Sequence, residues 1–265
     1  MNNDGSKPFL DHLEDLRKML FKSIIALVVC MGLCLGFVKY ILALLKHPLT
    51  VAAAAKNLPL DEMLVANTPM SPLNTIMQTA LLGGLLLALP FMLFFVGQFI
   101  LPALTAREKR LLIPAFSVGA ALFLGGVAFC YFLILPQTLT YLMDLGNFTE
   151  QRALWALDEY LGFIVQLLIA FGVSFELPLV IVILAKLGII SKKFLAKYRR
   201  HAFLVIFIFT TCMMPTTDPW SLMAMAGPMY LLYEASIFCV GWIERKRAAD
   251  DAANHWEDDY DGGAA

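Results

Sequence analysis

Residues 160–187 read YLGFIVQLLIAFGVSFELPLVIVILAKL, and this stretch decides the class of fold. It holds one acidic residue, Glu176, and it is long enough to cross a bilayer, because a spanning helix needs about 20 mostly apolar residues. The whole chain of 265 residues is 60% hydrophobic and 15% charged, against about 45–50% and about 25% in a soluble domain. The mean hydropathy is +0.73. The sequence therefore predicts an all-α membrane protein.

Six apolar runs predict six transmembrane helices. The runs cover residues 21–45, 73–100, 111–135, 160–187, 202–214 and 221–240. Pro215 and Pro219 separate the last two runs and predict a tight hairpin between two short helices. The fifth run has about 13 residues, which rise about 20 Å as a helix and fall short of a hydrocarbon core of about 30 Å. A hairpin turn submerged among protein, a locally thin bilayer or an oligomer contact would each explain this mismatch.

The Lys and Arg residues fall unevenly on the two sides of the predicted membrane. Sixteen of the twenty lie on one side, and the other side holds Lys39, Lys46, Lys56 and Arg152. Because Lys and Arg accumulate in cytoplasmic loops, both termini are predicted to be cytoplasmic. Residues 1–245 are expected to form a single six-helix transmembrane domain. Residues 246–265, rich in Ala, Asp, Glu and Gly, are expected to form a disordered acidic cytoplasmic tail.

Composition and motifs argue against several classes of function. The formal net charge of −1 leaves no basic excess for nucleic-acid binding. The five cysteines lie in apolar runs, and neither a CxxC pair nor a histidine spacing typical of zinc sites occurs. The sequence contains no Walker loop, GxGxxG turn or GxSxG elbow. The residues therefore show no catalytic motif and no metal site, and we expect no bound metal or cofactor.

The segment before the first run is amphipathic. Apolar residues recur at helical spacing between Phe9 and Leu20, and Asp11, Glu14 and Asp15 are among the charged residues on the other faces. This pattern predicts an interfacial helix that lies along the cytoplasmic surface before the chain turns into the membrane. It fits a simple membrane anchor, although this density of acids is unusual beside anionic lipid.

The first cytoplasmic loop, residues 97–110, reads GQFILPALTAREKR. One carboxylate, Glu108, is set among three cations and follows the apolar residues Phe99, Ile100 and Leu101. One interpretation is an ordinary loop ion pair, which is worth about 0–1 kcal/mol. The other is a receptor, because a carboxylate can bind a guanidinium through two parallel hydrogen bonds while the apolar residues hold an adjoining hydrophobic peptide. The residues alone leave both interpretations open.

Further residues depart from the local pattern. An ionisable side chain such as Glu176 costs about 2.5–3.5 kcal/mol at the centre of a span, so it should be protonated, hydrogen-bonded or next to a wet cavity. A proton relay and a structural bond to a carbonyl near Pro178 both fit. Asp218 is predicted to cap the last helix, with a partner contact as the alternative. Gly32 and Gly36 form a GxxxG step, which predicts a close helix contact.

Four phrases of the sequence resemble the TatC family, the polytopic core and signal-receptor subunit of the twin-arginine protein translocase. They are residues 12–17 (HLEDLR), residues 99–108 with Arg110, residues 171–178 (FGVSFELP) and residues 228–230 (PMY). They occur in the family's order within six spans, and the resemblance extends from Phe9 to about Val240. It implies a concave, glove-like helix bundle in the bacterial cytoplasmic (inner) membrane, without enzymatic turnover of its own.

The resemblance also implies a function and its residues. Such proteins bind the N-terminal signal of folded cargo, which carries two adjacent arginines. They assemble with TatA and TatB, and with further copies of themselves, for export driven by the proton-motive force. The implied signal-binding residues are Glu108, Phe99, Asp15, His12, Leu16 and Arg17. The implied partner-docking edge includes Pro215, Thr216, Thr217 and Asp218, and Glu176 lies on the polar concave face.

Three departures from the family pattern are present, one of them Met19 in place of a frequent Arg, and two other functions stay open. Asp15 stands where many members carry Glu, and Pro215-Thr216-Thr217 stands where Thr-Pro-Pro is common. One alternative is a proton-coupled small-solute permease that uses Glu176 as its carrier acid. The other is a scaffold that gathers membrane proteins and binds no signal peptide.

Overall fold

The computed structural model describes residues 9–56, 64–100, 106–148, 155–186, 188–213 and 219–261. Within these ranges the side chains of residues 9–12, 55, 106–115, 213, 220–221 and 247–261 are not described. The described chain is an all-α bundle with one short pair of strands. Within the described residues, five helical stretches are long and apolar enough to cross a membrane: Leu13–Gly36, Ser71–Ile100, Phe116–Phe148, Leu157–Lys186 and Leu222–Lys246. The predicted all-α polytopic membrane fold is therefore confirmed.

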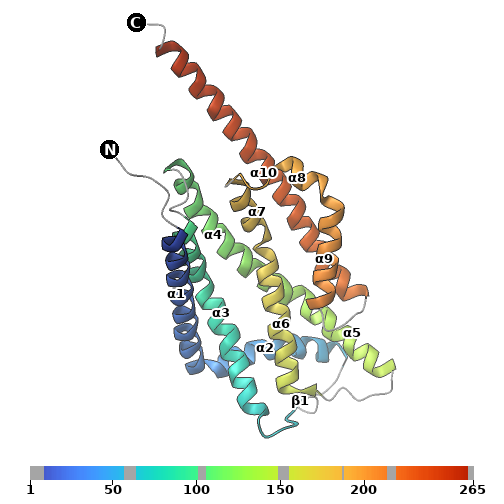
Figure 1. Ribbon diagram of the computed structural model, residues 1–265. Coiled ribbons are helices and arrows are strands. Elements are labelled where there is room, and N and C mark those ends of the chain that lie inside the picture. Colours follow the sequence, from blue (N-terminus) through green and yellow to red (C-terminus); the bar gives the residue numbers. More distant parts are fainter. Residues whose placement is uncertain are drawn as a thin grey trace.

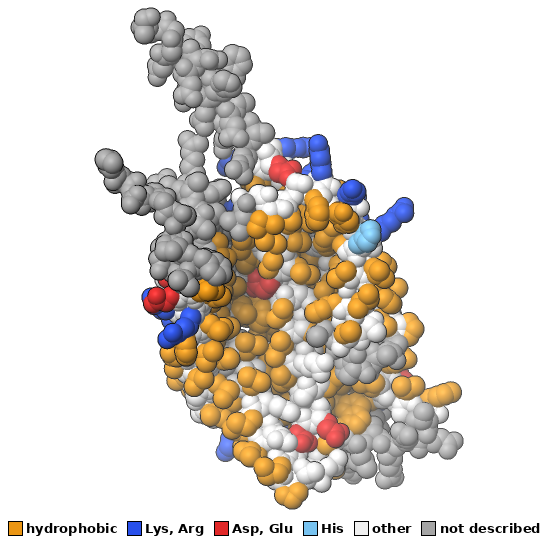
Figure 2. All heavy atoms as spheres, in the orientation of Figure 1, with side chains coloured by type: hydrophobic (Ala, Val, Ile, Leu, Met, Phe, Trp, Pro, Cys, Tyr) orange, Lys and Arg blue, Asp and Glu red, His pale blue; other side chains and the backbone are white. Residues whose placement is uncertain are grey.

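The helices run between two ends of the bundle, which we name by the elements found there (Figure 1). The α8 end carries α8 (Lys192–Lys197) and the start of α1 (Phe9–Gly36). The α2 end carries α2 (Val38–Ala55) and β1 (Leu64–Val65). In Figure 2 apolar side chains cover the middle of the visible face, whereas charged side chains gather towards the two ends. This distribution is the one expected of a protein that spans a bilayer.

The N-terminal segment differs from the prediction of a separate interfacial helix. α1 runs without interruption from the amphipathic segment into the apolar run, because residues 9–31 contain neither Gly nor Pro to break it. The chain turns after Gly36, where the Phe37 amide donates a hydrogen bond to the Cys34 carbonyl at 3.0 Å. α2 then lies across the α2 end (Figure 1). The first span therefore ends at Gly36 and not at residue 45.

The middle of the chain forms three long paths through the bundle. α3 (Ser71–Ile100) matches the predicted second span closely. α4 (Ala106–Phe129) continues through the π-helical turn η3 (Cys130–Ile134) into α5 (Leu135–Phe148), and so extends well beyond the predicted end at residue 135. β2 (Trp155–Ala156) precedes α6 (Leu157–Phe175), which is followed by α7 (Leu177–Lys186). The predicted fourth span is thus two helices that meet at Glu176.

The last part of the chain forms α8, α9 and α10. α9 (Arg199–Met213) has 15 residues, which agrees with the short fifth run. α10 (Pro219–Asp261) has 43 residues and continues as a helix well past residue 246, where a disordered tail is predicted. Residues 242–261 contain no Gly or Pro and include four alanines, the best helix formers, which favours continuation of the helix.

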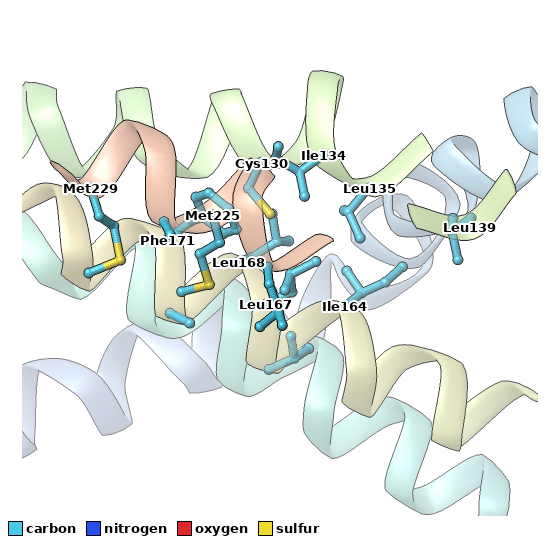
Figure 3. Packing of buried hydrophobic residues seen from close by; sticks show 14 of the residues in the cluster. Cys130, Ile134, Leu135, Leu139, Ile164, Leu167, Leu168, Phe171, Met225 and Met229 are labelled. Carbon is cyan, nitrogen blue, oxygen red and sulfur yellow. The ribbon is translucent and has the colours of Figure 1, made fainter. Parts of the chain in front are cut away.

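α6 lies at the centre of the buried core. Leu161, Ile164, Leu167 and Phe171 of α6 are completely buried. Figure 3 shows how the α6 side chains meet residues of η3, α5 and α10, including Cys130, Leu135, Met225 and Met229. The core therefore joins the middle of the chain to its last helix.

α1 packs mainly against α3, through two glycines of α3. A Cβ atom added at Gly84 would lie 2.7 Å from Met31 Cα, and one at Gly83 would lie 2.9 Å from Cys34 Sγ. Nothing lies within 4 Å of a Cβ added at Gly32 or Gly36. The predicted close contact at the GxxxG step is therefore not made among the described residues. The two backbones approach each other at the glycines of the facing helix instead.

At the α2 end, three links join segments that are distant in sequence. β1 and β2 pair in parallel, with Leu64 opposite Trp155. The Ser71 hydroxyl donates a hydrogen bond of 2.7 Å to Asp158, and Lys56 forms an ion pair with Asp144. These links tie the segment after α2 to the segments on both sides of β2.

Candidate functional site

At the α8 end, the start of α1 lies beside the end of α3 (Figure 1). A cavity of about 240 Å³ lies between the two helices. Its lining residues are Asp15, Lys18, Met19, Lys22, Phe95, Gln98 and Phe99. We call this the α1–α3 pocket. It brings together Asp15 of the N-terminal segment and Phe99 near the first loop, two residues that the family resemblance assigns to one site.

Helical spacing explains which side chains reach the pocket. Asp15, Met19 and Lys22 are spaced by four and three residues and so share one face of α1. Phe95 and Phe99 are one turn apart on α3. Lys22 bridges the two helices, because its Nζ lies 6.0 Å from the centroid of the Phe95 ring, within the range of a cation–π contact.

The charges around the pocket are partly paired. Lys18 forms an ion pair of 2.8 Å with Glu14, one turn earlier on α1, and both side chains are about 60% exposed. Such an exposed pair is worth less than about 1 kcal/mol, so it breaks easily when another charged group approaches. Among the described residues that line the pocket, Asp15 supplies the one carboxylate. The pocket can therefore bind a cation through Asp15, beside the aromatic rings of Phe95 and Phe99.

The other predicted signal-binding residues fall into two groups. Leu16 and Arg17 do not line the pocket, since Leu16 is 41% exposed and the Arg17 guanidinium lies 5.7 Å from the Phe21 ring centroid. His12 belongs to α1, and Glu108 is the third residue of α4. The side chains of these two residues lie outside those that the structure describes. Residues 215–218 of the predicted docking edge lie outside the described residues altogether.

The sequence did not indicate that Lys18, Met19, Lys22, Phe95 and Gln98 line the pocket. Their helical spacing from Asp15 and Phe99 is visible in the sequence. Which face of α1 meets which face of α3 is not visible, because both helices are apolar on several sides. The glycine pair on α3 is the one signal that could have indicated the contact, since small residues allow close approach of membrane helices.

A second cavity, of about 510 Å³, lies between α3 and α4. Its lining residues are Pro90, Phe94, Gly97, Gln98, Phe116, Ser117 and Ala120. Gln98 also lines the α1–α3 pocket, so the two cavities adjoin at this residue. A Cβ atom at Gly97 would lie 2.8 Å from the Phe116 ring, so glycine is needed for this close packing. The mainly apolar lining suits the side chains of a hydrophobic peptide.

Glu176 lies at the break between α6 and α7. Its amide donates to the Val173 carbonyl and its carbonyl accepts from the Val180 amide, both at 3.1 Å. Both carboxylate oxygens are buried, and no described residue hydrogen-bonds them. A bond from this acid to a carbonyl near Pro178 is therefore not formed within the described part of the chain. A Cβ at Gly119 of α4 would lie 3.0 Å from Glu176 Oε2, so α4 passes directly beside the acid.

Comparison with known proteins agrees with this architecture. A family model, TatC: Sec-independent protein translocase protein (TatC), matches residues 11–228. The chain is 36% identical over 242 residues to the Sec-independent protein translocase protein TatC of Aquifex aeolicus (strain VF5), covering 91% of this chain and 97% of that one. It is 37% identical over 236 residues to the protein of the same name from Deinococcus radiodurans, covering 88% and 85%.

Solved structures agree as well. A crystal structure of the twin-arginine translocase receptor TatC in DDM superimposes with a TM-score of 0.75 and 34% identity, covering 86% of this chain and 99% of that one. Fold and similarity together define a polytopic membrane component of a protein translocase. The chain belongs to the TatC family of Sec-independent protein translocase proteins.

Family membership confirms the resemblance inferred from the four phrases. It assigns the chain a role in protein translocation, in a complex with other Tat subunits, and this is a transporter-type role. A small-solute permease does not fit this family.

Proposed function

We propose that this protein is the receptor for twin-arginine signal peptides in a translocase of the bacterial cytoplasmic membrane. In this proposal the α8 end faces the cytoplasm, together with both termini, and the signal binds at the α1–α3 pocket. The observation that carries the proposal is that Asp15 and Phe99, which are 84 positions apart in sequence, line the same pocket. The name of the similar crystal structure, a twin-arginine translocase receptor, supports it.

The chemistry of recognition follows from the residues around the pocket. We assign one signal guanidinium to Asp15 and the other to Glu108, because a planar guanidinium can donate two parallel hydrogen bonds to a carboxylate. His12, Leu16 and Arg17 form the rim on α1 in this arrangement. The hydrophobic part of the signal contacts Phe99 and continues past Gln98 into the cavity between α3 and α4.

Partners and the energy source complete the proposal. The short helix α9, its hairpin residues Pro215, Thr216, Thr217 and Asp218, and the adjoining part of α10 dock single-span subunits of the TatA and TatB type. Export of folded cargo is driven by the proton-motive force. Several copies of the chain assemble in the complex.

The binding site is tested by paired substitutions of neighbouring acids. Asp15→Asn and Glu108→Gln each remove a charge-assisted hydrogen bond, which is worth about 1.5–3 kcal/mol, so the affinity for a purified twin-arginine signal peptide should fall about 10- to 100-fold. Glu14→Gln is the matched control, because Glu14 is paired with Lys18 and does not line the pocket. Its affinity should stay within about twofold of the wild type.

The measurement is fluorescence anisotropy of a labelled signal peptide with the purified protein in detergent. A peptide with two lysines in place of the arginines should bind more weakly, because an ammonium group cannot form the two parallel bonds. Unchanged affinity in both Asp15→Asn and Glu108→Gln would show that neither acid takes part in signal binding. An equal loss of affinity in Glu14→Gln would mean that the substitutions act through the general surface charge and not through the pocket.

Glu176 has a second role in the proposal. Its buried carboxyl, without a partner among the described residues, binds polar groups of the translocating chain or of a partner helix within the bilayer. Glu176→Ala should therefore lower export while signal binding in detergent stays at the wild-type level. Normal export in Glu176→Ala would discard this role without affecting the signal site.

A further inference from the structure

Exposed cationic and aromatic side chains gather on α8 and on the first turn of α9. We name this group the α8 patch and define it by six exposed residues: Lys193, Phe194, Lys197, Tyr198, Arg200 and His201. Figure 2 shows Lys, Arg and His side chains gathered at this corner of the molecule, next to apolar ones. The α8 patch is separate from the α1–α3 pocket and shares no residue with it.

Ring contacts order the aromatic part of the α8 patch. The Phe194 and Tyr198 ring centroids are 4.7 Å apart, and the Tyr198 and His201 centroids are 5.4 Å apart in an edge-to-face arrangement. Lys197 Nζ lies 5.7 Å from the centroid of the Tyr198 ring. Phe194 is 51% exposed, so this large apolar ring faces away from the protein despite its contact with Tyr198. The rings of Phe194, Tyr198 and His201 therefore form an ordered surface on the outside of the protein.

The α8 patch is held firmly on α10. The Lys192 amide donates to Glu244 at 2.8 Å, and the Tyr233 hydroxyl donates to the Leu195 carbonyl at 2.9 Å. Arg199, which follows the patch residue Tyr198, forms an ion pair of 2.9 Å with Glu234. These contacts engage both Glu244 and Glu234 of α10. They fix the position of α8 without involving the cations of the patch.

The cations of the α8 patch keep their charge uncompensated within the described chain. Lys193, Lys197 and Arg200 form no ion pair with any described residue. Directly after the patch, α9 exposes a large apolar surface through Phe203, Leu204, Val205 and Ile208. The patch therefore lies at the boundary between a charged end of the bundle and a surface that suits acyl chains. Cations and aromatic rings at this level are typical of contacts with lipid headgroups.

We propose that the α8 patch binds the phosphate headgroup of an anionic phospholipid. Lys193, Lys197 and Arg200 contact the phosphate, Phe194 and Tyr198 insert at the level of the glycerol backbone, and the acyl chains lie on the exposed face of α9. A twin-arginine signal is itself cationic, so the cations of the patch repel it and favour the lipid. The bound lipid places the α8 end of α9 at the headgroup level of the bilayer.

The test compares lipid retention by purified full-length protein in native mass spectrometry. The protein is equilibrated in detergent with equal amounts of phosphatidylglycerol and phosphatidylcholine. Wild-type protein should retain phosphatidylglycerol in preference, and Lys193→Gln/Lys197→Gln should lower that preference about tenfold. The matched control is Lys39→Gln/Lys46→Gln, which removes the same charge away from the patch and should leave the preference unchanged. Circular dichroism shows whether each variant is folded.

Further arms distinguish the source of the bound anion. Inorganic phosphate at 100-fold excess over the lipid should not displace phosphatidylglycerol, because it offers no acyl chains to α9. Displacement by phosphate, or by a hexaglutamate peptide, would assign the patch to a soluble anion or an acidic protein and overturn the proposal. Equal retention of the two lipids by the wild type, or equal loss in both double variants, would also overturn it. Signal-peptide affinity is measured in parallel and should not change in Lys193→Gln/Lys197→Gln.

Discussion

α1 and α6 are both apolar membrane-spanning helices, yet they are embedded very differently. About 17% of the apolar stretch in Leu13–Gly36 of α1 is buried inside the protein, against 50% for the apolar stretch in Leu157–Lys186, which α6 and α7 form. α6 contacts several helices, whereas α1 rests mainly on α3 through Gly83 and Gly84. The candidate signal site lies on the loosely embedded helix. The comparison teaches that the buried core and the candidate recognition site are located in different parts of this bundle.

The largest expected effect on the free energy of unfolding is at the centre of α6. Phe171→Ala removes a completely buried ring that lies 6.1 Å from the Phe129 ring, centroid to centroid. Loss of such a side chain costs about 3–5 kcal/mol of unfolding free energy, because the cavity left behind lacks packing partners. Phe21→Ala on α1 is the matched control, since Phe21 is 56% exposed and should change stability by less than about 0.5 kcal/mol. Denaturant titration in detergent, followed by circular dichroism, measures both. Equal losses of unfolding free energy in Phe171→Ala and Phe21→Ala would contradict the conclusion that α6 is more deeply embedded than α1.

An intermediate effect is expected at the contact between α1 and α3. Gly84→Val would place new atoms against the Met31 backbone and should cost about 1–3 kcal/mol or detach α1 from α3. Detachment exposes Cys34, which is 4% exposed in the folded protein, so maleimide labelling followed by mass spectrometry should show faster modification of Cys34. Gly32→Val is the matched control, because nothing lies within 4 Å of its Cβ position. Faster labelling in Gly32→Val alone would reverse our assignment of the packed face.

The smallest effect is expected at the ion pair between Lys56 and Asp144. Both side chains are partly exposed, so Lys56→Gln should lower the unfolding free energy by less than about 1 kcal/mol. A double-mutant cycle with Asp144→Asn isolates the coupling between the two residues. The coupling should shrink further in high salt, since salt screens exposed charges. A coupling of several kcal/mol would instead place this pair among the main determinants of stability.

Much of the fold was predictable from hydropathy, because a bilayer imposes a minimum length on each apolar run. The location of α3 and the short α9 follow directly from this rule. The turn after Gly36 and the π-helical turn at Cys130 were not predictable, because apolar residues continue on both sides of each position. Hydropathy reports how apolar a segment is and not the direction in which it runs. The extension of α10 was missed because a charged, alanine-rich sequence fits both a solvated helix and a disordered tail.

The candidate site was predictable in part. Asp15 and Phe99 were singled out by the resemblance to the family, and they line one pocket. The role of Gln98, which lines both cavities, was not predictable, because a single amide in an apolar helix carries no signal of which neighbours it meets. The positions of Leu16 and Arg17 outside the pocket depend on the rotation of α1 against α3. That rotation is set by the glycines of α3, and so by the partner helix.

The links at the α2 end have a mechanical consequence. The pairing of Leu64 with Trp155, the hydrogen bond from Ser71 to Asp158 and the ion pair of Lys56 with Asp144 fasten the bundle there. Helices that are linked at one end of a bundle can separate only at the other end. Any separation of the helices that keeps these links intact therefore occurs at the α8 end. Among the five spanning stretches of the described residues, the one in α1 has the smallest buried share, so α1 can move with the least loss of buried contact.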